Sequence, residues 1–132
     1  MIEYLDLVDD NDRVIGQEAR DIIYKYGSRN FRGVNIFLFN RRGELLVPQR
    51  SQDRRLFPGC YDFSVSEHVA AGEGYLEAAR RGLQEELGIE DEELLEVGYF
   101  RPKINNTSCF QKLYKLIFDG RLNYDHEGIA RI

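Results

Sequence analysis

The sequence has few cysteines and no long apolar run, and each absence excludes a class of protein. Its two cysteines, Cys60 and Cys109, stand far apart in 132 residues without a CxxC pair or neighbouring histidines, so neither a zinc site nor a disulfide framework is indicated. No apolar run approaches the roughly 20 residues of a membrane helix, and the first residues lack a signal-peptide pattern. We therefore expect a cytoplasmic protein with reduced thiols and no membrane segment.

The chain also lacks a block of basic residues. Its 18 lysines and arginines are mixed with 23 acidic residues, which gives a formal net charge of −5. Because a protein that binds polymeric nucleic acid usually carries a basic stripe, we do not expect polymeric nucleic acid as a partner. With 42% hydrophobic residues and no internal repeat, the length suits one compact domain over residues 1–132.

Hydrophobic periodicity predicts a mixture of strands and helices. The expected strands are residues 2–8, 14–16, 34–39, 45–47, 61–65, 94–101 and 110–118, with one short strand after residue 119. A short helix is expected at 18–25, and helical spacing predicts a longer one from Tyr75 to Leu87, capped by Gly88. Its buried stripe is predicted to be Leu76, Ala79, Leu83 and Leu87. These elements indicate an α/β layered domain.

Carboxylates gather on this longer helix and on the loop before it. Successive helical residues turn by about 100°, so Glu85 and Glu86 lie on the same face as Gly82. Carboxylates that share a face repel each other unless a hard cation such as Mg²⁺ lies between them, and Mg²⁺ commonly bridges carboxylates to phosphates. The pattern therefore favours metal-assisted hydrolysis of a diphosphate. The alternative is a solvated helix end, with Glu73 as a first-turn acid favoured by the helix dipole.

The segment from Glu67 to Ile89 resembles the signature of the Nudix hydrolases, Gly-x5-Glu-x7-Arg-Glu-apolar-x-Glu-Glu-x-Gly-apolar. The matching residues are Glu73, Arg81, Leu83, Glu85, Glu86, Gly88 and Ile89. The resemblance implies a Nudix fold, an α/β/α sandwich with a mixed β-sheet. It also implies cleavage of a diphosphate bond in a nucleoside diphosphate linked to another moiety.

The same resemblance implies roles for individual residues. Glu85 and Glu86 are expected to hold Mg²⁺ or Mn²⁺ and to act in catalysis. Arg81 and Glu73 are expected to pair and so to hold the loop against the helix. Glu77 is an alternative partner for Arg81, because the two residues are spaced i, i+4.

Two positions depart from the signature. Gly82 stands where the family has a glutamate, and Glu67 stands where it has a glycine. Loss of one catalytic group typically lowers a rate about 10²–10⁴-fold, so we expect weak hydrolysis or replacement by another carboxylate. Glu67 is the candidate replacement and third metal ligand, and the alternative is an exposed loop acid. The adjacent His68 is either a phosphate or metal ligand or a partly buried, hydrogen-bonded residue.

Three further charged residues are candidates for substrate binding. Arg50, at the end of a predicted strand, and Lys103, in a late loop, are expected to meet diphosphate oxygens. Glu127 lies where many Nudix proteins place a further carboxylate. The expected substrate is a small-molecule diphosphate whose identity stays open, as does the oligomeric state, with a homodimer as one option. Because the family usually continues with another strand and helix, we expect a naturally short or trimmed chain.

Residues 3–16 and 43–51 resemble the Nudix branch related to type I isopentenyl-diphosphate isomerase. That enzyme needs a catalytic cysteine where Ser66 stands and metal-binding histidines near Tyr24 and Phe31, so isomerisation is disfavoured. Cys60 is offset from the cysteine position and is expected to serve packing. The alternatives to a hydrolase are thus a catalytically impaired Nudix module that binds a nucleotide or protein, which Gly82 favours, and an isomerase-like enzyme.

Overall fold

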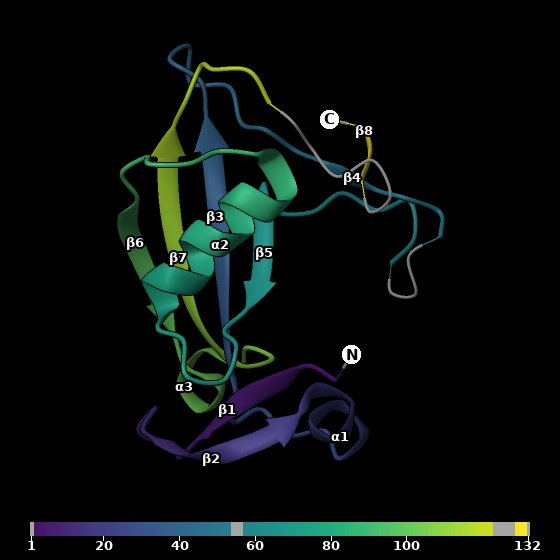
Figure 1. Ribbon diagram of the computed structural model, residues 1–132, viewed down its shortest axis with the longest axis vertical. Coiled ribbons are helices and arrows are strands. Elements are labelled where there is room, and N and C mark those ends of the chain that lie inside the picture. Colours follow the sequence, from purple (N-terminus) through teal and green to yellow (C-terminus); the bar gives the residue numbers. More distant parts are fainter. Residues whose placement is uncertain (1, 54–56, 123–128, 132) are drawn as a thin grey trace.

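The core of the protein is a mixed four-stranded sheet in the order β5-β3-β7-β6, seen in a computed structural model that describes residues 2–53, 57–122 and 129–131. The strands are β3 (Arg32–Phe39), β5 (Val65–His68), β6 (Leu95–Phe100) and β7 (Phe110–Ile117). Strand β3 pairs parallel with β7 and antiparallel with β5, while β6 pairs antiparallel with β7 (Figure 1). The predicted α/β class with a mixed sheet is confirmed.

Helix α2 (Tyr75–Leu87) lies across one face of this sheet, as predicted, and ends at Gly88 in the left-handed conformation (Figure 1). Its buried residues are Ala78, Ala79, Gly82, Leu83 and Leu87. The prediction that Leu76 is buried is wrong, because the buried face runs through Ala78 and leaves Leu76 39% exposed. No described helix combines the length and apolar character that crossing a membrane requires.

A second, smaller layer forms at the N-terminus. Strands β1 (Tyr4–Val8) and β2 (Val14–Ala19) make the predicted antiparallel hairpin, and α1 (Arg20–Lys25) is the predicted short helix. We call residues 2–28 the N-terminal unit; it lies beyond one end of the sheet (Figure 1). A small apolar cluster of Leu5, Ile23, Phe31 and Cys109 joins the unit to the core.

Asp12, at the turn of the hairpin, joins the N-terminal unit to the core through its side chain. Its carboxylate accepts hydrogen bonds from the hydroxyls of Tyr75 and Tyr99, each at 2.7 Å, and from Arg32 Nε at 2.7 Å. The side chain of Asp12 is only 10% exposed, so these bonds replace its lost hydration. Because Tyr75 is the first residue of α2, Asp12 holds the start of that helix.

Two predicted strands are wrong. Residues 45–47 make only one bridge, between Phe39 and Leu45, and residues 61–65 make only a bridge between Gln49 and Tyr61 before β5 begins. Tyr61 is 62% exposed, because no long neighbouring strand receives these apolar residues. The chain forms instead β4 (Gln49–Arg50), paired with β8 (Ile129–Arg131), which confirms a short strand in the tail. An unpredicted helix, α3 (Pro102–Asn105), follows β6.

Candidate active site

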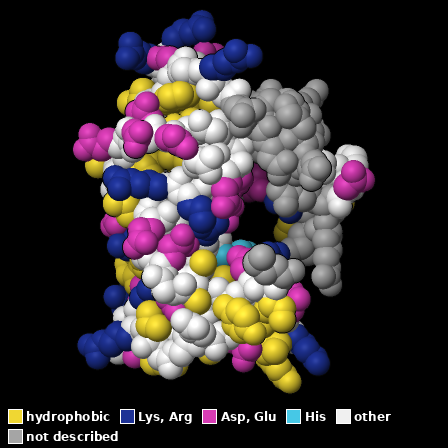
Figure 2. Space-filling model, viewed as in Figure 1, with side chains coloured by type: hydrophobic (Ala, Val, Ile, Leu, Met, Phe, Trp, Pro, Cys, Tyr) yellow, Lys and Arg dark blue, Asp and Glu magenta, His cyan; other side chains and the backbone are white. Residues whose placement is uncertain are grey.

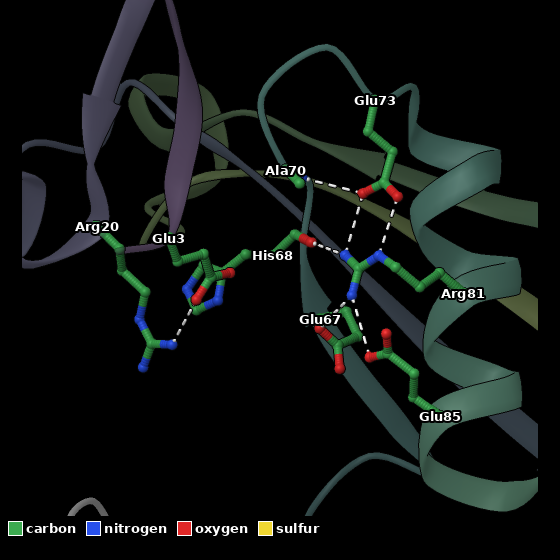
Figure 3. A network of polar contacts seen from close by, with 8 residues as sticks. All are labelled: Glu3, Arg20, Glu67, His68, Ala70, Glu73, Arg81 and Glu85. Carbon is green, nitrogen blue, oxygen red and sulfur yellow. Dashed lines mark hydrogen bonds and ion pairs between the residues drawn. The ribbon is translucent and has the colours of Figure 1, made fainter. Parts of the chain in front are cut away.

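Arg81 ties the loop before α2 to the helix. Its Nε and Nη2 donate to the two carboxylate oxygens of Glu73 at 2.9 and 3.0 Å, which confirms the predicted pair (Figure 3). Nη2 also donates to the carbonyl oxygen of His68 at 2.8 Å, and Glu73 accepts from the amide of Ala70 at 3.0 Å. Such a two-pronged contact sets orientation as well as distance. Glu77, the alternative partner, accepts from the amide of Gly74.

The charges of this pair stabilise each other. Hydrogen bonding to Glu73 raises the pKa of Arg81 above its ordinary value, against the opposing effect of burial. Burial alone would raise the pKa of Glu73, but the hydrogen bonds from Arg81 and Ala70 and the charge of Arg81 together lower it. Both side chains therefore stay charged at neutral pH, and the loop remains tied to the helix.

Two further carboxylates converge on the same guanidinium. Arg81 Nη1 lies 3.2 Å from Glu67 Oε2 and 3.3 Å from Glu85 Oε2 (Figure 3). Glu67 belongs to β5 and its side chain is 21% exposed, so the interpretation as an exposed loop acid is wrong. In the described ranges, no three acidic, histidine or cysteine side chains are grouped as metal ligands.

Gly82 and Glu67, the two departures from the Nudix signature, face each other across the β5–α2 contact. A Cβ atom at position 82 would lie 2.6 Å from Cγ of Glu67 and 3.0 Å from Cγ1 of Val65. The first distance is shorter than packed carbon atoms permit. The stem of Glu67 therefore fills the space that a side chain on the helix would take, and the two departures lie in direct contact.

These carboxylates open onto a cleft of about 920 Å³, and Glu67, Glu85 and Glu86 line it together. Figure 2 shows its mouth as a hollow with acidic side chains and a histidine at the edge. The structure thus brings together the three residues predicted as metal ligands. Arg50 of β4, a predicted substrate-binding residue, lines the same cleft and pairs with Asp62 at 2.9 Å.

The other predicted substrate-binding residues are not placed in this cleft. Lys103 lies in α3, pairs with Asp10 at 2.5 Å and lines a separate cavity of about 500 Å³. Glu127 lies outside the described residues.

A chain of polar side chains forms part of the cleft lining, and sequence reasoning missed it. Ser66 Oγ donates to Asn35 Oδ1 at 2.8 Å, Asn35 Nδ2 donates to Gln111 Oε1 at 2.9 Å, and Gln111 Nε2 donates to Ser108 Oγ at 3.3 Å. The one available signal was a polar residue, Asn35, inside the apolar run 34–39. Its partners come from β5, β7 and the loop before β7, so only the sheet register joins them.

His68 lies among aromatic side chains. Its Nε2 is hydrogen-bonded to the hydroxyl of Tyr24, and its ring centroid lies 5.7 Å from that of Tyr24 and 5.8 Å from that of Phe31. Burial lowers the pKa of His68, and the positive charge of Arg20 lowers it further. The interpretation of His68 as a partly buried, hydrogen-bonded residue is confirmed. Tyr24 and Phe31 stand near the positions of two isomerase histidines. At these positions His68 therefore has aromatic neighbours in place of histidines.

Known proteins share both the sequence and the fold. A family model described as NUDIX domain matches residues 29–128. An uncharacterised Nudix hydrolase of Nostoc sp. is 42% identical over 128 residues, which cover 94% of this chain and 75% of that protein. An isopentenyl-diphosphate Delta-isomerase of Serratia proteamaculans is 34% identical over 126 residues, which cover 92% of this chain and 69% of the isomerase.

Solved structures agree with these relatives. A crystal structure of a Deinococcus radiodurans protein, 36% identical, superposes with a TM-score of 0.87 over 98% of this chain and 80% of that one. A MutT protein of Methanosarcina mazei, 21% identical, has a TM-score of 0.59 over 75% of this chain and 72% of that one, a likeness of fold alone. The implied Nudix fold is confirmed, and the chain belongs to the Nudix hydrolase family.

Proposed function

We propose that this Nudix hydrolase cleaves a diphosphate bond in a nucleoside diphosphate linked to another moiety, with Mg²⁺ or Mn²⁺ held by Glu67, Glu85 and Glu86. The observation that carries the proposal is the meeting of carboxylates from β5 and α2 at the wall of one cleft. Glu67 supplies from the strand the carboxylate that Gly82 does not supply from the helix.

The donor set fits a hard divalent cation. Glu67 and Glu85 both approach one positively charged nitrogen, Arg81 Nη1, at 3.2 and 3.3 Å, so carboxylates from β5 and α2 converge on the same cationic group. A metal site requires these two side chains to turn from Arg81 toward the cleft, while Glu73 keeps its two contacts with Arg81. When bound, the metal supplies charge neutralisation for the phosphoryl oxygens and favours attack by water.

The chain's own residues orient the substrate and handle protons. The oxygen of water attacks a phosphorus atom, the bond from that phosphorus to the leaving oxygen breaks, and its electron pair stays with the leaving phosphate. A carboxylate of the group accepts the proton of the attacking water. Arg50, which lines the same cleft, offers a guanidinium to the diphosphate oxygens. Arg81 and Glu73 keep β5 and α2 in register.

The rival functions fit these residues less well. A catalytically impaired module is favoured by Gly82, yet Glu67 occupies the space beside that glycine. An isomerase is favoured by the Serratia proteamaculans relative. However, the residue at the position of the isomerase cysteine is Ser66, whose hydroxyl is engaged with Asn35. A cytoplasmic location, a single domain and a homodimer stay predictions from the sequence.

The first experiment measures Mg²⁺- and Mn²⁺-dependent hydrolysis of nucleoside diphosphates and triphosphates, nucleotide sugars, dinucleoside polyphosphates and prenyl diphosphates, with the phosphate and phosphomonoester products separated by ion-exchange chromatography. We expect Glu86→Gln and Glu67→Gln each to lower kcat about 10²–10⁴-fold. Glu90→Gln is the matched control, because Glu90 is exposed just beyond α2 and does not line the cleft. A natural protein that hydrolyses none of these compounds would overturn the hydrolase proposal and support a binding module.

A second variant tests the exchange between strand and helix. The double change Glu67→Gly with Gly82→Glu moves the carboxylate back to the position that the Nudix signature gives it. We expect this protein to recover much of the turnover lost in Glu67→Gly alone. If the double variant stays as inactive as Glu67→Gly, the carboxylate of Glu67 does not replace the missing glutamate of the helix.

A further inference from the structure

The N-terminal unit lies outside the segment that the Nudix family model matches, which begins at residue 29. It nevertheless contacts the loop that leads into α2. The amide of Ala71 donates to the carbonyl oxygen of Tyr4 at 2.9 Å, and the amide of Gly72 donates to Oδ2 of Asp6 at 3.1 Å. Asp6 is buried, with 4% of its surface exposed, so its contact is well shielded from water. The unit therefore packs against the loop before α2.

In this position, the N-terminal unit contributes side chains of α1 to the cleft. Arg20 and Tyr24 line the same cleft as Glu67, Glu85 and Glu86. Tyr24 is hydrogen-bonded to His68, the residue that follows Glu67 in β5. In Figure 3, Arg20 lies on one side of His68, and Glu67 and Arg81 lie on the other. The cleft thus has one wall that the Nudix segment does not provide.

Arg20 has an exchangeable partner. Its Nη1 pairs with Glu3 at 3.0 Å, with about two fifths of each side chain exposed (42% and 41%), and exposed ion pairs are weak. Its Nε is buried and has no hydrogen-bond partner among the described residues, which is an unfavourable state for a donor. Arg81, by contrast, is held by Glu73 through two hydrogen bonds. An incoming anion can therefore replace Glu3 at Arg20 Nη1 at little cost.

We propose that Arg20 is a substrate-binding residue, which exchanges Glu3 for a phosphoryl oxygen of the diphosphate. Tyr24 holds the guanidinium in place, since the guanidinium carbon of Arg20 lies 5.5 Å from the centroid of the Tyr24 ring. The hydrogen bond to His68 in turn fixes Tyr24. This inference rests on the proposed function, and it makes the N-terminal unit a part of the active site that selects substrates carrying an anionic group at that wall.

Binding and kinetics of three single variants test the inference. The probe is methylenediphosphonate, a diphosphate analogue that water does not cleave, titrated calorimetrically with Mg²⁺ present. We expect Arg20→Met to weaken its binding about 10- to 100-fold and to raise the KM of the best diphosphate substrate by a similar factor, with kcat nearly unchanged. Glu3→Gln is expected to tighten binding, because it removes the competing carboxylate. Lys25→Met, on the same helix and outside the cleft, is the matched control.

The outcomes separate this inference from the proposed function. The inference would be overturned if Arg20→Met bound the probe as tightly as the natural protein does and unfolded at the same temperature. Arg20 would then be no substrate-binding residue. A natural protein that does not bind the probe would also overturn the inference. Metal-dependent hydrolysis in either case would leave the proposed function standing. Weakened binding by Arg20→Met supports the inference even if turnover of the natural protein is undetectable.

Discussion

The close approach of Glu67 to Gly82 makes an unusual prediction for the substitution Gly82→Ala. In an ordinary helix interior this change stabilises a protein by about 1 kcal/mol. Here the new Cβ atom would lie 2.6 Å from Cγ of Glu67 and 3.0 Å from Cγ1 of Val65. Overpacking of this kind costs about 1–3 kcal/mol, so we expect Gly82→Ala to destabilise the protein by about 1 kcal/mol.

The same reasoning predicts the opposite sign once Glu67 is shortened. In the background Glu67→Ala, Cγ is absent and only the tight contact with Val65 Cγ1 at 3.0 Å remains, so Gly82→Ala should stabilise by less than the full helix preference of about 1 kcal/mol. The two positions are thus expected to be coupled by about 1–2 kcal/mol in a double-mutant cycle. Because Gly82→Ala pushes Glu67 aside, we also expect it to reduce metal-dependent hydrolysis.

Urea unfolding at pH 7 of the natural protein, the two single variants and the double variant measures this coupling. The four proteins are compared by their urea midpoints, provided that the dependence of the unfolding free energy on urea concentration is unchanged. A change in that slope would mean a different unfolded state. Effects of the two substitutions that add within about 0.5 kcal/mol would refute the coupling between Glu67 and Gly82. A Gly82→Ala protein that is more stable than the natural one would refute the steric reasoning as well.

Three other predictions concern stability and thiol chemistry. Because the pKa of Glu73 is lowered in the folded protein, its contribution to stability is present above pH 4.5 and is lost as the pH falls through the folded value. As the pH falls below 4.5, the urea midpoint of Glu73→Gln should therefore decrease less steeply than that of the natural protein. An equally steep decrease in both proteins would contradict the ion pair. Asp12→Ala should lower the free energy of unfolding by about 1–3 kcal/mol, because it removes the shared acceptor of three partly buried donors, Arg32, Tyr75 and Tyr99; a change near zero in urea melts would contradict this. Burial raises the pKa of the Cys109 thiol to about 11, so at pH 8 iodoacetamide should modify exposed Cys60 and spare Cys109, and equal labelling by mass spectrometry would contradict the placement.

Local patterns account for the parts of the site that were predicted. The helix 75–87 and its cap at Gly88 follow from spacing within a few turns, and the Glu73–Arg81 pair lies within one continuous segment. Such features depend on near neighbours in the chain, which the sequence states directly. The prediction of a strand at 45–47 was wrong because a strand depends on residues that are distant in the chain. A strand needs a partner, and no local pattern reveals that Leu45 makes only one bridge.

Residues that meet across the fold were beyond local reasoning. Arg20 and Tyr24 reach the cleft because the N-terminal unit packs against the loop before α2, a contact between distant segments. Lys103 carries the right charge for a phosphate, yet α3 places it in another cavity beside Asp10. Charge and sequence position alone do not determine which cavity a side chain enters.

The sequence by itself determined the family signature, the helix 75–87 and the two departures from the signature at Glu67 and Gly82. Only the tertiary structure decided that the departures pack against each other. The sheet register sets Glu67 opposite Val34 on the face that α2 covers, and the glycine on α2 leaves room for its side chain. Since fourteen intervening residues separate the two positions, only the packing of strand against helix makes them neighbours.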